Sequence, residues 1–317
     1  MLTRMLLCVL LALSFAADAG AETYPDRPVT IIVPFAAGGS VDMVARFAGQ
    51  ALQDKLKQPF VIDFRPGANS RLGTSFVARS KPDGYTLLLF SGSLMVNPST
   101  QKDLPYDTVK DFAPVGMLGE NANVLVVSQK LGVKTLQELV ALSKSRRLKY
   151  GSSGTGGPLH LAAELFKSAA DVSAVHVPYK GTGAMFPDLM SGEIDLAVVS
   201  IPSGMPFIKS GDIRALAVTG AERAASLPDV PTMTEAGIAL RTAVPYGLVA
   251  PAKTPEAVVR RLNDTLAEVL RSDELEQRFS AGEIRPIHMT PDETAAFIRS
   301  EIDRYADIVK KAGIGTD

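Results

Sequence analysis

The chain has very few of the residues that carry covalent, redox or metal chemistry. Its 317 residues include one cysteine, Cys8, and three histidines that lie far apart in sequence. Cys8 lies in an N-terminal segment that we expect to be removed, so the mature protein can form no disulfide, thiolate nucleophile or thiolate metal site. We expect neither a metal site nor a cofactor.

Net charge is the second thing that the sequence lacks. The 33 basic residues offset 34 acidic ones, which leaves a formal net charge of -1, and the chain contains no basic block. This balance argues against nucleic acid and against an anionic membrane surface as partners. Because 46% of the residues are hydrophobic, the chain can bury a core without disulfides, and we expect a monomer of two lobes.

The N-terminus has the pattern of a secretory signal peptide. Arg4 precedes the apolar run of residues 5–17, which gives way to small residues. The run is shorter than the roughly 20 apolar residues that span a bilayer, and Cys8 lies inside it, so we expect neither a membrane anchor nor a lipid anchor. We predict that residues 1–21 are removed and that the mature protein is periplasmic.

The remaining sequence alternates between strand and helix patterns, which predicts an α/β fold. Residues 29–35 form a continuous apolar run, typical of a strand buried on both faces of a parallel sheet. Helical spacing follows over residues 41–56. Similar units recur along the chain, with strands predicted at 60–64, 86–90, 123–127, 148–150, 174–177, 194–199, 213–218 and 244–249. We expect the C-terminus to be helical, with helix starts at Thr254 and Thr290.

The order of these units predicts two lobes joined by two crossing segments. Residues 95–122 are proline-rich and are expected to be irregular, crossing from the first lobe to the second, and residues 240–247 to return. We assign residues 22–122 and 247–317 to lobe one and residues 123–246 to lobe two. Two crossings form a hinge, and the cleft between the lobes is the expected ligand site.

Two glycine-rich turns are the strongest local signals. The first, Pro34-Phe-Ala-Ala-Gly-Gly-Ser40, follows the first strand, where ligands of open α/β sheets bind. Unpaired amides at the start of the next helix suit a carboxylate. The second turn, Gly151-Ser-Ser-Gly-Thr-Gly-Gly157, repeats the arrangement. A tight connection without a ligand is the alternative for each turn, and the pair favours a cleft, where both turns would contact one anion. The second turn matches neither the phosphate-loop pattern nor the dinucleotide-binding pattern.

Other polar residues near predicted strand ends have two interpretations. Ser91 and Ser93 close the third strand, where they either line the cleft or form a turn without a ligand. Asp42 either complements the helix dipole or binds a ligand hydroxyl or amine. His160 and Glu164 are one helical turn apart, but no second histidine is near, so a capping or core role for His160 is favoured over metal binding.

The ordered motifs of the mature chain resemble the extracytoplasmic receptors of tripartite tricarboxylate transporters, the Bug-type solute-binding proteins. The matches include Tyr24-Pro-Asp-Arg-Pro28, Arg65-Pro-Gly67, Pro82-Asp-Gly-Tyr-Thr-Leu87, Tyr150-Gly-Ser-Ser-Gly154, Val175-His-Val-Pro-Tyr-Lys-Gly181 and Leu227-Pro-Asp-Val-Pro-Thr232. The resemblance implies a two-lobed periplasmic-binding-protein fold, each lobe a mostly parallel sheet flanked by helices. It also implies that the protein binds a small organic acid, delivers it to a two-component membrane permease and is not an enzyme.

Carried onto this chain, the resemblance implies a set of ligand-binding residues from both lobes. They are Phe35, Ala37, Gly38, Gly39, Ser40, Asp42, Ser91, Ser93, Ser153, Thr155, Gly156, His160 and Ser200. The chain departs from the family at several positions around the expected pocket. Alanines replace prolines at positions 36 and 37, residues 68–71 read Ala-Asn-Ser-Arg, Tyr246 replaces a common tryptophan, and an aspartate is absent near Ser200. Loss of that acidic group favours a dicarboxylate, a tricarboxylate or an aromatic acid over a ligand with an ammonium group.

Two other functions are compatible with parts of the sequence. A secreted serine hydrolase or esterase requires a serine paired with a histidine and a carboxylate, and no serine here lies in a G-x-S-x-G elbow. A receptor that signals to a membrane sensor requires the same closing lobes as a transport receptor, and the sequence does not separate these two uses.

Overall fold

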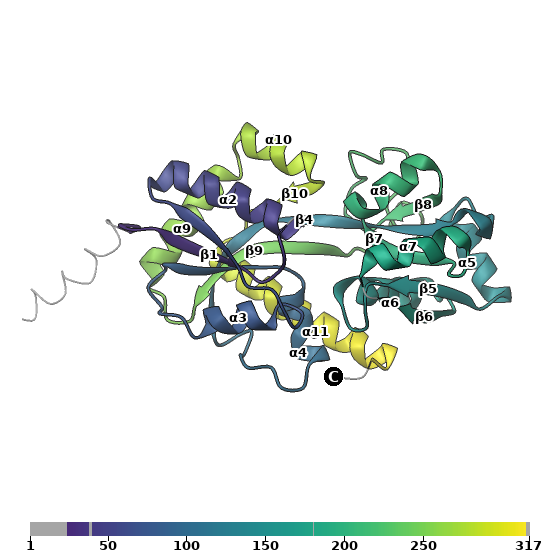
Figure 1. Cartoon of the computed structure of the whole chain (residues 1–317), viewed down its shortest axis with the longest axis horizontal. Coiled ribbons are helices and arrows are strands. Elements are labelled where there is room, and N and C mark those ends of the chain that lie inside the picture. The colour runs from purple at the N-terminus through teal and green to yellow at the C-terminus, as the bar shows by residue number, and fades with distance from the viewer. Residues whose placement is uncertain (1–23, 38–39, 180, 315–317) are drawn as a thin grey trace, which may run out of the picture.

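The computed structural model describes residues 24–37, 40–179 and 181–314, arranged as two α/β halves side by side (Figure 1). The predicted signal peptide lies outside the described residues. Within the described ranges, no helix combines the length and the apolar character needed to cross a membrane.

The first half is a mixed sheet with strand order β2-β1-β3-β9-β4 and β10 on the other edge of β4. Its strands are β1 Val29–Val33, β2 Phe60–Phe64, β3 Thr86–Phe90, β9 Ala243–Pro251, β10 Ile284–Pro286 and the first part of β4 Phe112–Ser128. Strands β2, β1 and β3 are parallel. Because β9 is antiparallel to both β3 and β4, the strand β4 points the same way as β3. Most strands therefore share one direction, as predicted.

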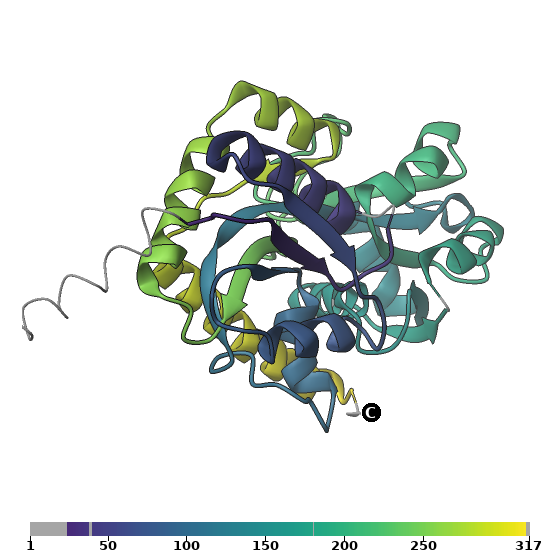
Figure 2. The same cartoon turned by 60° about the vertical axis from the view of Figure 1, so that its left-hand side comes forward.

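Helices cover both faces of this sheet (Figures 1 and 2). One core packs the apolar strand residues against α2 Ser40–Leu56, α9 Glu256–Val269 and α10 Asp273–Ala281. The other core packs them against α3 Arg71–Ala78, α4 Ser93–Thr100 and α11 Pro291–Ala312. Burial on both faces explains why the strands read as continuous apolar runs.

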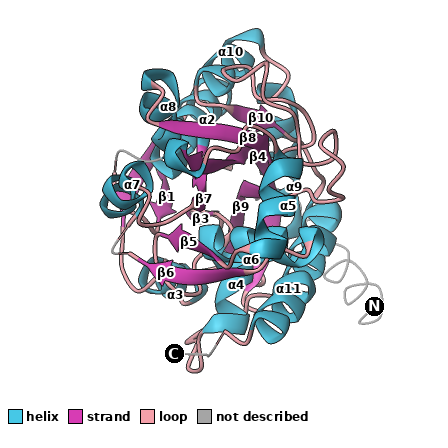
Figure 3. Ribbon diagram, turned by 90° about the vertical axis from the view of Figure 1, so that its right-hand side faces the viewer, coloured by secondary structure: helices cyan, strands magenta, loops and turns pink. Residues whose placement is uncertain are grey.

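The second half has the same layered plan (Figure 3). Strands β6, β5 and β7 are parallel to one another, and the second part of β4 is antiparallel to β7 and β8. The strands are β5 Leu148–Ser152, β6 Ala174–Pro178, β7 Leu196–Ser200 and β8 Ile213–Val218. Helices α5 Leu136–Ser145 and α6 Pro158–Ala170 cover one face, and α7 Thr182–Ser191 and α8 Ile201–Ser210 cover the other.

The expectation that residues 95–122 are irregular was wrong. They include most of α4 and the first 11 residues of β4, a 17-residue strand that runs from the first sheet into the second. The prolines led to the wrong prediction, because Pro114 cannot donate a ladder hydrogen bond and so argues against a strand. The structure accommodates it with register shifts between Pro114 and Gly116 and between Met117 and Gly119. The outgoing connection is therefore a continuous strand, and β9 pairs with it on the way back.

The predicted helix starts differ in outcome. Thr290 forms the complete capping box of α11. Thr254 does not cap α9: the capping position is Pro255, and the Thr254 hydroxyl donates to the carbonyl of Pro251.

One helix packs across both halves. The apolar side chains of Ile298, Tyr305 and Val309 in α11 share a core with Leu161 of α6 in the second half. Contact between α11 and α6 therefore adds a buried apolar link to the two strand connections.

Candidate functional site

The turn between β5 and α6 presents backbone amides at the boundary between the halves. Gly154 and Gly156 have φ angles of 141° and 72°, the left-handed region where glycine is favoured. Gly157 is the capping residue of α6 and provides no side-chain cap. The first amides of α6 are thus not covered by a capping side chain, which is the arrangement that binds carboxylates at helix starts.

A buried stack of rings lies beneath this turn. The rings of His160 and His176 are stacked with centroids 3.8 Å apart, and Tyr150 stacks on His176 at 5.0 Å. His160 Nδ1 accepts a hydrogen bond from the Gly156 amide at 2.9 Å. Ser152 Oγ lies 2.6 Å from His176 Nε2 and accepts a hydrogen bond from the Gly154 amide at 3.2 Å. Both histidines therefore hold the turn in place from below.

The stack favours neutral imidazoles. Burial, with a smaller contribution from His176, lowers the pKa of His160 to about 4. Burial also lowers the pKa of His176. A neutral His160 keeps the Nδ1 lone pair that accepts the hydrogen bond from the Gly156 amide, so this support of the turn is present at neutral pH.

A cavity of about 570 Å³ lies between this turn and the first half, within the usual range for ligand pockets. Its lining from the second half includes Ser153, Thr155 and Gly156. Its lining from the first half includes residues 68, 69 and 71 and the end of α4. The two halves are close here, because a Cβ on Gly156 would lie 3.5 Å from the Thr100 side chain.

The first glycine turn is described only at its ends, since Gly38 and Gly39 lie outside the described residues. Phe35 packs against the first core, and Ala37 is exposed. Ser40 Oγ lies 2.8 Å from the hydroxyl of Tyr246, which is 3.0 Å from Asn121 Oδ1. The start of α2 is thereby tied to β9 and β4, the two strands that connect the halves.

Asp42 lies 7% exposed in the first turn of α2 and forms an ion pair with Arg46, with Nε and Oδ1 2.6 Å apart. This arrangement combines the expected complement to the helix dipole with an i,i+4 pair.

The serines after β3 and β7 also lie close to the boundary between the halves. Ser91 and Ser93 are buried, and Ser93 Oγ is 3.4 Å from Asn69 Oδ1. A Cβ on Gly92 between them would lie 3.8 Å from Pro158, at the start of α6. Ser200 ends β7 opposite Asn123 of β4, and its hydroxyl donates to Ser203 Oγ at 2.8 Å.

The segment at residues 67–71 was not among the predicted ligand contacts, although its departure from the family pattern lay around the expected pocket. Gly67, Ala68, Asn69 and Ser70 all have positive φ angles, between 47° and 133°. Asn69 is held by Asn97 of α4: its Nδ2 donates to Asn97 Oδ1 at 2.8 Å, and Asn97 Nδ2 donates to the Asn69 carbonyl at 2.9 Å. No periodicity reveals such a turn, and its only sequence signal was the departure from the glycines common in the family.

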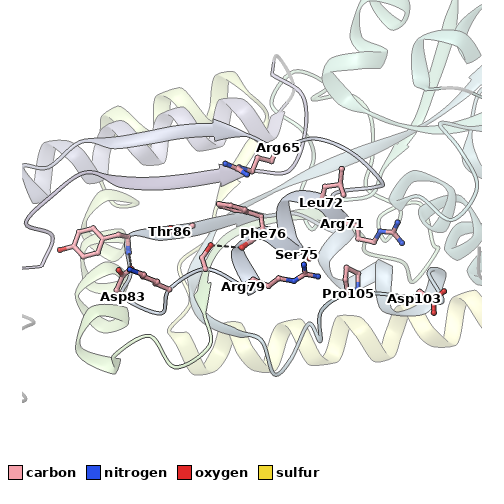
Figure 4. Close-up of a pocket in the computed structure, with 13 residues that line it drawn as sticks. Arg65, Arg71, Leu72, Ser75, Phe76, Arg79, Asp83, Thr86, Asp103 and Pro105 are labelled. Atoms are coloured by element: carbon pink, nitrogen blue, oxygen red, sulfur yellow. Dashed lines mark hydrogen bonds between the residues drawn. The ribbon is translucent and has the colours of Figure 1, made fainter.

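A larger groove of about 1140 Å³ lies on the outer side of the first half (Figure 4). Its lining residues run from 65 to 105 and include Phe76, which is 41% exposed beneath the Arg65 guanidinium. All of them belong to the first half. Closure of the two halves cannot enclose a ligand there, so the smaller cavity fits a receptor site better.

The close Ser152–His176 pair does not form a catalytic triad. Ser152 is 1% exposed, and its hydroxyl is engaged by the backbone of Gly154. In the described part of the chain no carboxylate hydrogen-bonds to His176, whereas a triad needs one to orient the imidazole. The pair supports the turn.

A metal site at His160 and Glu164 is not supported either. Glu164 accepts a hydrogen bond from the Tyr150 hydroxyl and forms an ion pair with Lys167 at 2.6 Å. Across the described ranges, no group of three or more His, Cys, Asp or Glu residues is arranged to hold a metal ion.

Known proteins match nearly the whole chain. Residues 44–314 match the family described as "Tripartite tricarboxylate transporter family receptor". Protein BugT of Bordetella pertussis (strain Tohama I) is 38% identical over 303 residues, covering 94% of this chain and 93% of BugT. A solved structure described as a periplasmic transporter is 41% identical, with a TM-score of 0.79, and covers 93% of this chain and 100% of its own. R. palustris Rpa4515 with adipate is 35% identical, with a TM-score of 0.80 and the same coverage.

Proposed function

Because the chain belongs to the tripartite tricarboxylate transporter receptor family and is a solute-binding receptor, not an enzyme, we propose that it captures a small carboxylate between its two halves. The ligand is a dicarboxylate, a tricarboxylate or an aromatic acid. One observation carries this proposal: the amide-rich turn of α6 and the first half line one cavity, and no acidic side chain is among its lining residues. Such a cavity favours an anion and disfavours an ammonium group.

The ligand contacts that we propose come from both halves. The second half supplies Ser153 and Thr155, while Gly156 and His160, joined by the bond from the Gly156 amide to His160 Nδ1, set the shape of the turn. Around them lie the other predicted contacts: Phe35, Ala37, Gly38, Gly39, Ser40 and Asp42 at the first turn, Ser91 and Ser93 after β3, and Ser200 after β7. The similarity to Rpa4515 with adipate supports a carboxylate ligand.

The proposed lobes are residues 22–122 with 247–317 and residues 123–246. We propose that they close over the ligand about the β4 and β9 connections. The family's transport role supports delivery of the closed complex, as a monomer, to a two-component permease. Removal of residues 1–21 would place the mature receptor in the periplasm, which agrees with the periplasmic relatives.

A thermal-shift screen of the mature protein tests this function. The panel contains mono-, di- and tricarboxylates, benzoate, and amino acids as the comparison group. A ligand that binds only the folded state raises the melting temperature in a concentration-dependent way. We expect shifts with organic acids and none with amino acids, followed by calorimetric titration of each hit. No shift with any organic acid, or tighter binding of an amino acid, would reject the proposal.

A further inference from the structure

The interlobe cavity contains one charged side chain among its described lining residues. Ten of the lining positions are uncharged: alanine, asparagine, threonines, glutamine, serine, glycines and proline. The eleventh is Arg71, at the first position of α3. A ligand in this cavity therefore encounters amides and hydroxyls from the second half and a guanidinium from the first.

Arg71 has no ion-pair partner among the described residues, in contrast to Arg65 and Arg27. Arg65 pairs with Asp63 at 2.9 Å and lies 3.6 Å above the Phe76 ring. Arg27 pairs with Asp83 at 3.2 Å. In Figure 4 Arg71 extends from the start of α3 toward the second half, whereas Arg79 lines only the outer groove. Its five donors are thus available to an anion in the cavity.

The backbone before Arg71 holds its position. Three non-glycine residues, Ala68, Asn69 and Ser70, have left-handed φ angles in succession, which is unfavourable for each of them. Hydrogen bonds from Asn97 of α4 stabilise this conformation, and the Arg71 amide donates to the Ala68 carbonyl at 3.1 Å.

We propose that Arg71 determines specificity by pairing with a second carboxylate of the ligand. One carboxylate binds the turn at residues 153–157 through amides other than those of Gly154 and Gly156, which bond to Ser152 and His160. The other carboxylate binds the Arg71 guanidinium across the cavity. Guanidinium and carboxylate groups form paired, charge-assisted hydrogen bonds, which a monocarboxylate of equal length cannot make at that end. The receptor thereby selects dicarboxylates over monocarboxylates. This inference rests on the proposed carboxylate function.

Matched pairs of acids and matched variants test the inference. Calorimetric titration compares adipate with hexanoate and succinate with butyrate, on the mature wild-type protein, Arg71→Gln and Arg79→Gln. Arg79→Gln removes a charge of the same kind from the same helix but lies outside the cavity. For the better-bound dicarboxylate, we expect Arg71→Gln to weaken binding at least roughly tenfold. Binding of the matching monocarboxylate should weaken less than about twofold in the same variant. Arg79→Gln should leave both unchanged.

Several outcomes would overturn the inference. Equal loss for the dicarboxylate and its monocarboxylate, or equal loss in Arg71→Gln and Arg79→Gln, would show that Arg71 does not read the second carboxylate. Wild-type binding of monocarboxylates or benzoate alone would also reject it while leaving carboxylate binding intact. If the wild type bound no organic acid at all, the proposed function itself would fail. Arg71→Lys, which keeps the charge without the planar fork, should retain intermediate affinity and guards against a folding defect in Arg71→Gln.

Discussion

The two glycine-rich turns are supported in different ways. In the second half, Gly154 and Gly156 rest on Ser152, His176 and His160, all within β5, β6 and α6. In the first half, the start of α2 is tied through Ser40 to Tyr246 and Asn121, on the strands that connect the halves. The second turn is therefore held by residues of its own half, whereas the start of α2 is linked to the strands that we propose as the hinge. Substitutions beneath the second turn should affect local order, and those at Tyr246 should affect closure.

The largest expected effect is at Gly156. Gly156→Ala places a Cβ on a residue with φ of 72°, and a shift of the turn relieves the strain. Because the ligand requires the original turn, we expect affinity for the bound carboxylate to fall about tenfold in calorimetric titration. Gly132→Ala is the matched control: its φ is 76°, and no atom lies within 4 Å of the added Cβ. It should lose about 1 kcal/mol of stability and keep its affinity. Equal affinities of the two variants would contradict a role for the Gly156 turn.

The next effect concerns the ring stack. His160→Phe keeps an aromatic ring but leaves the buried Gly156 amide without its acceptor. We expect the free energy of unfolding in urea to fall by about 1–3 kcal/mol, the cost of an unsatisfied buried donor. His288→Phe, at an exposed position, serves as the control and should be close to neutral. A neutral His160→Phe would show that the hydrogen bond does not support the turn.

The stack also predicts a dependence of stability on pH. The pKa of His160 is about 4 in the folded protein, below its ordinary value of 6.5, so the unfolded chain binds more protons between these values. The contribution of neutral His160 to the free energy of unfolding is therefore fully present above pH 6.5 and is lost as the pH falls toward 4. Between pH 7 and 5, we expect the wild type to lose about 1–2 kcal/mol more unfolding free energy than His160→Phe does. Parallel pH profiles of the two proteins would exclude this contribution.

The smallest effect is expected at the hinge. Tyr246→Phe removes the hydroxyl that lies between Ser40 and Asn121 without changing the ring in the core. We expect about 1 kcal/mol less stability, as for the loss of one buried hydrogen bond, and a change in the rate of ligand association that exceeds the change in His160→Phe. Stopped-flow fluorescence of a dye at the cleft rim measures that rate. A larger change in association rate in His160→Phe than in Tyr246→Phe would contradict the link between Tyr246 and closure.

Local patterns predicted much of the fold. The apolar runs at 60–64 and 86–90 correspond to β2 and β3, and the helical spacing after residue 40 corresponds to α2. The exceptions have physical causes. β4 contains Pro114 and adopts its extended path through pairing with β9, β7 and β8, partners that are distant in sequence. The missed α10 and β10 are short elements, and β10 exists because it pairs with β4.

For the candidate site, sequence reasoning found the turn at 151–157 but not what surrounds it. Glycines between a strand and a helix are visible in the sequence because their conformational role is local. The sequence marked residues 68–71 only as a departure from the family pattern. Their role in lining the cavity was not predicted, because Asn69 and Arg71 lie there through a left-handed backbone that Asn97 stabilises. The pairing of Ser152 with His176 was likewise invisible, since 24 residues separate them.

The sequence by itself determined the family, the α/β class and the glycine turn at 151–157, because each of these depends on short motifs and on the periodicity of apolar residues. Only the tertiary structure decided which first-half residues face the second turn. That choice depends on strand pairings and on buried contacts between distant segments, including the ring stack and the Asn69–Asn97 bonds. The placement of one uncompensated arginine in the interlobe cavity is a consequence of packing, and no linear pattern encodes it.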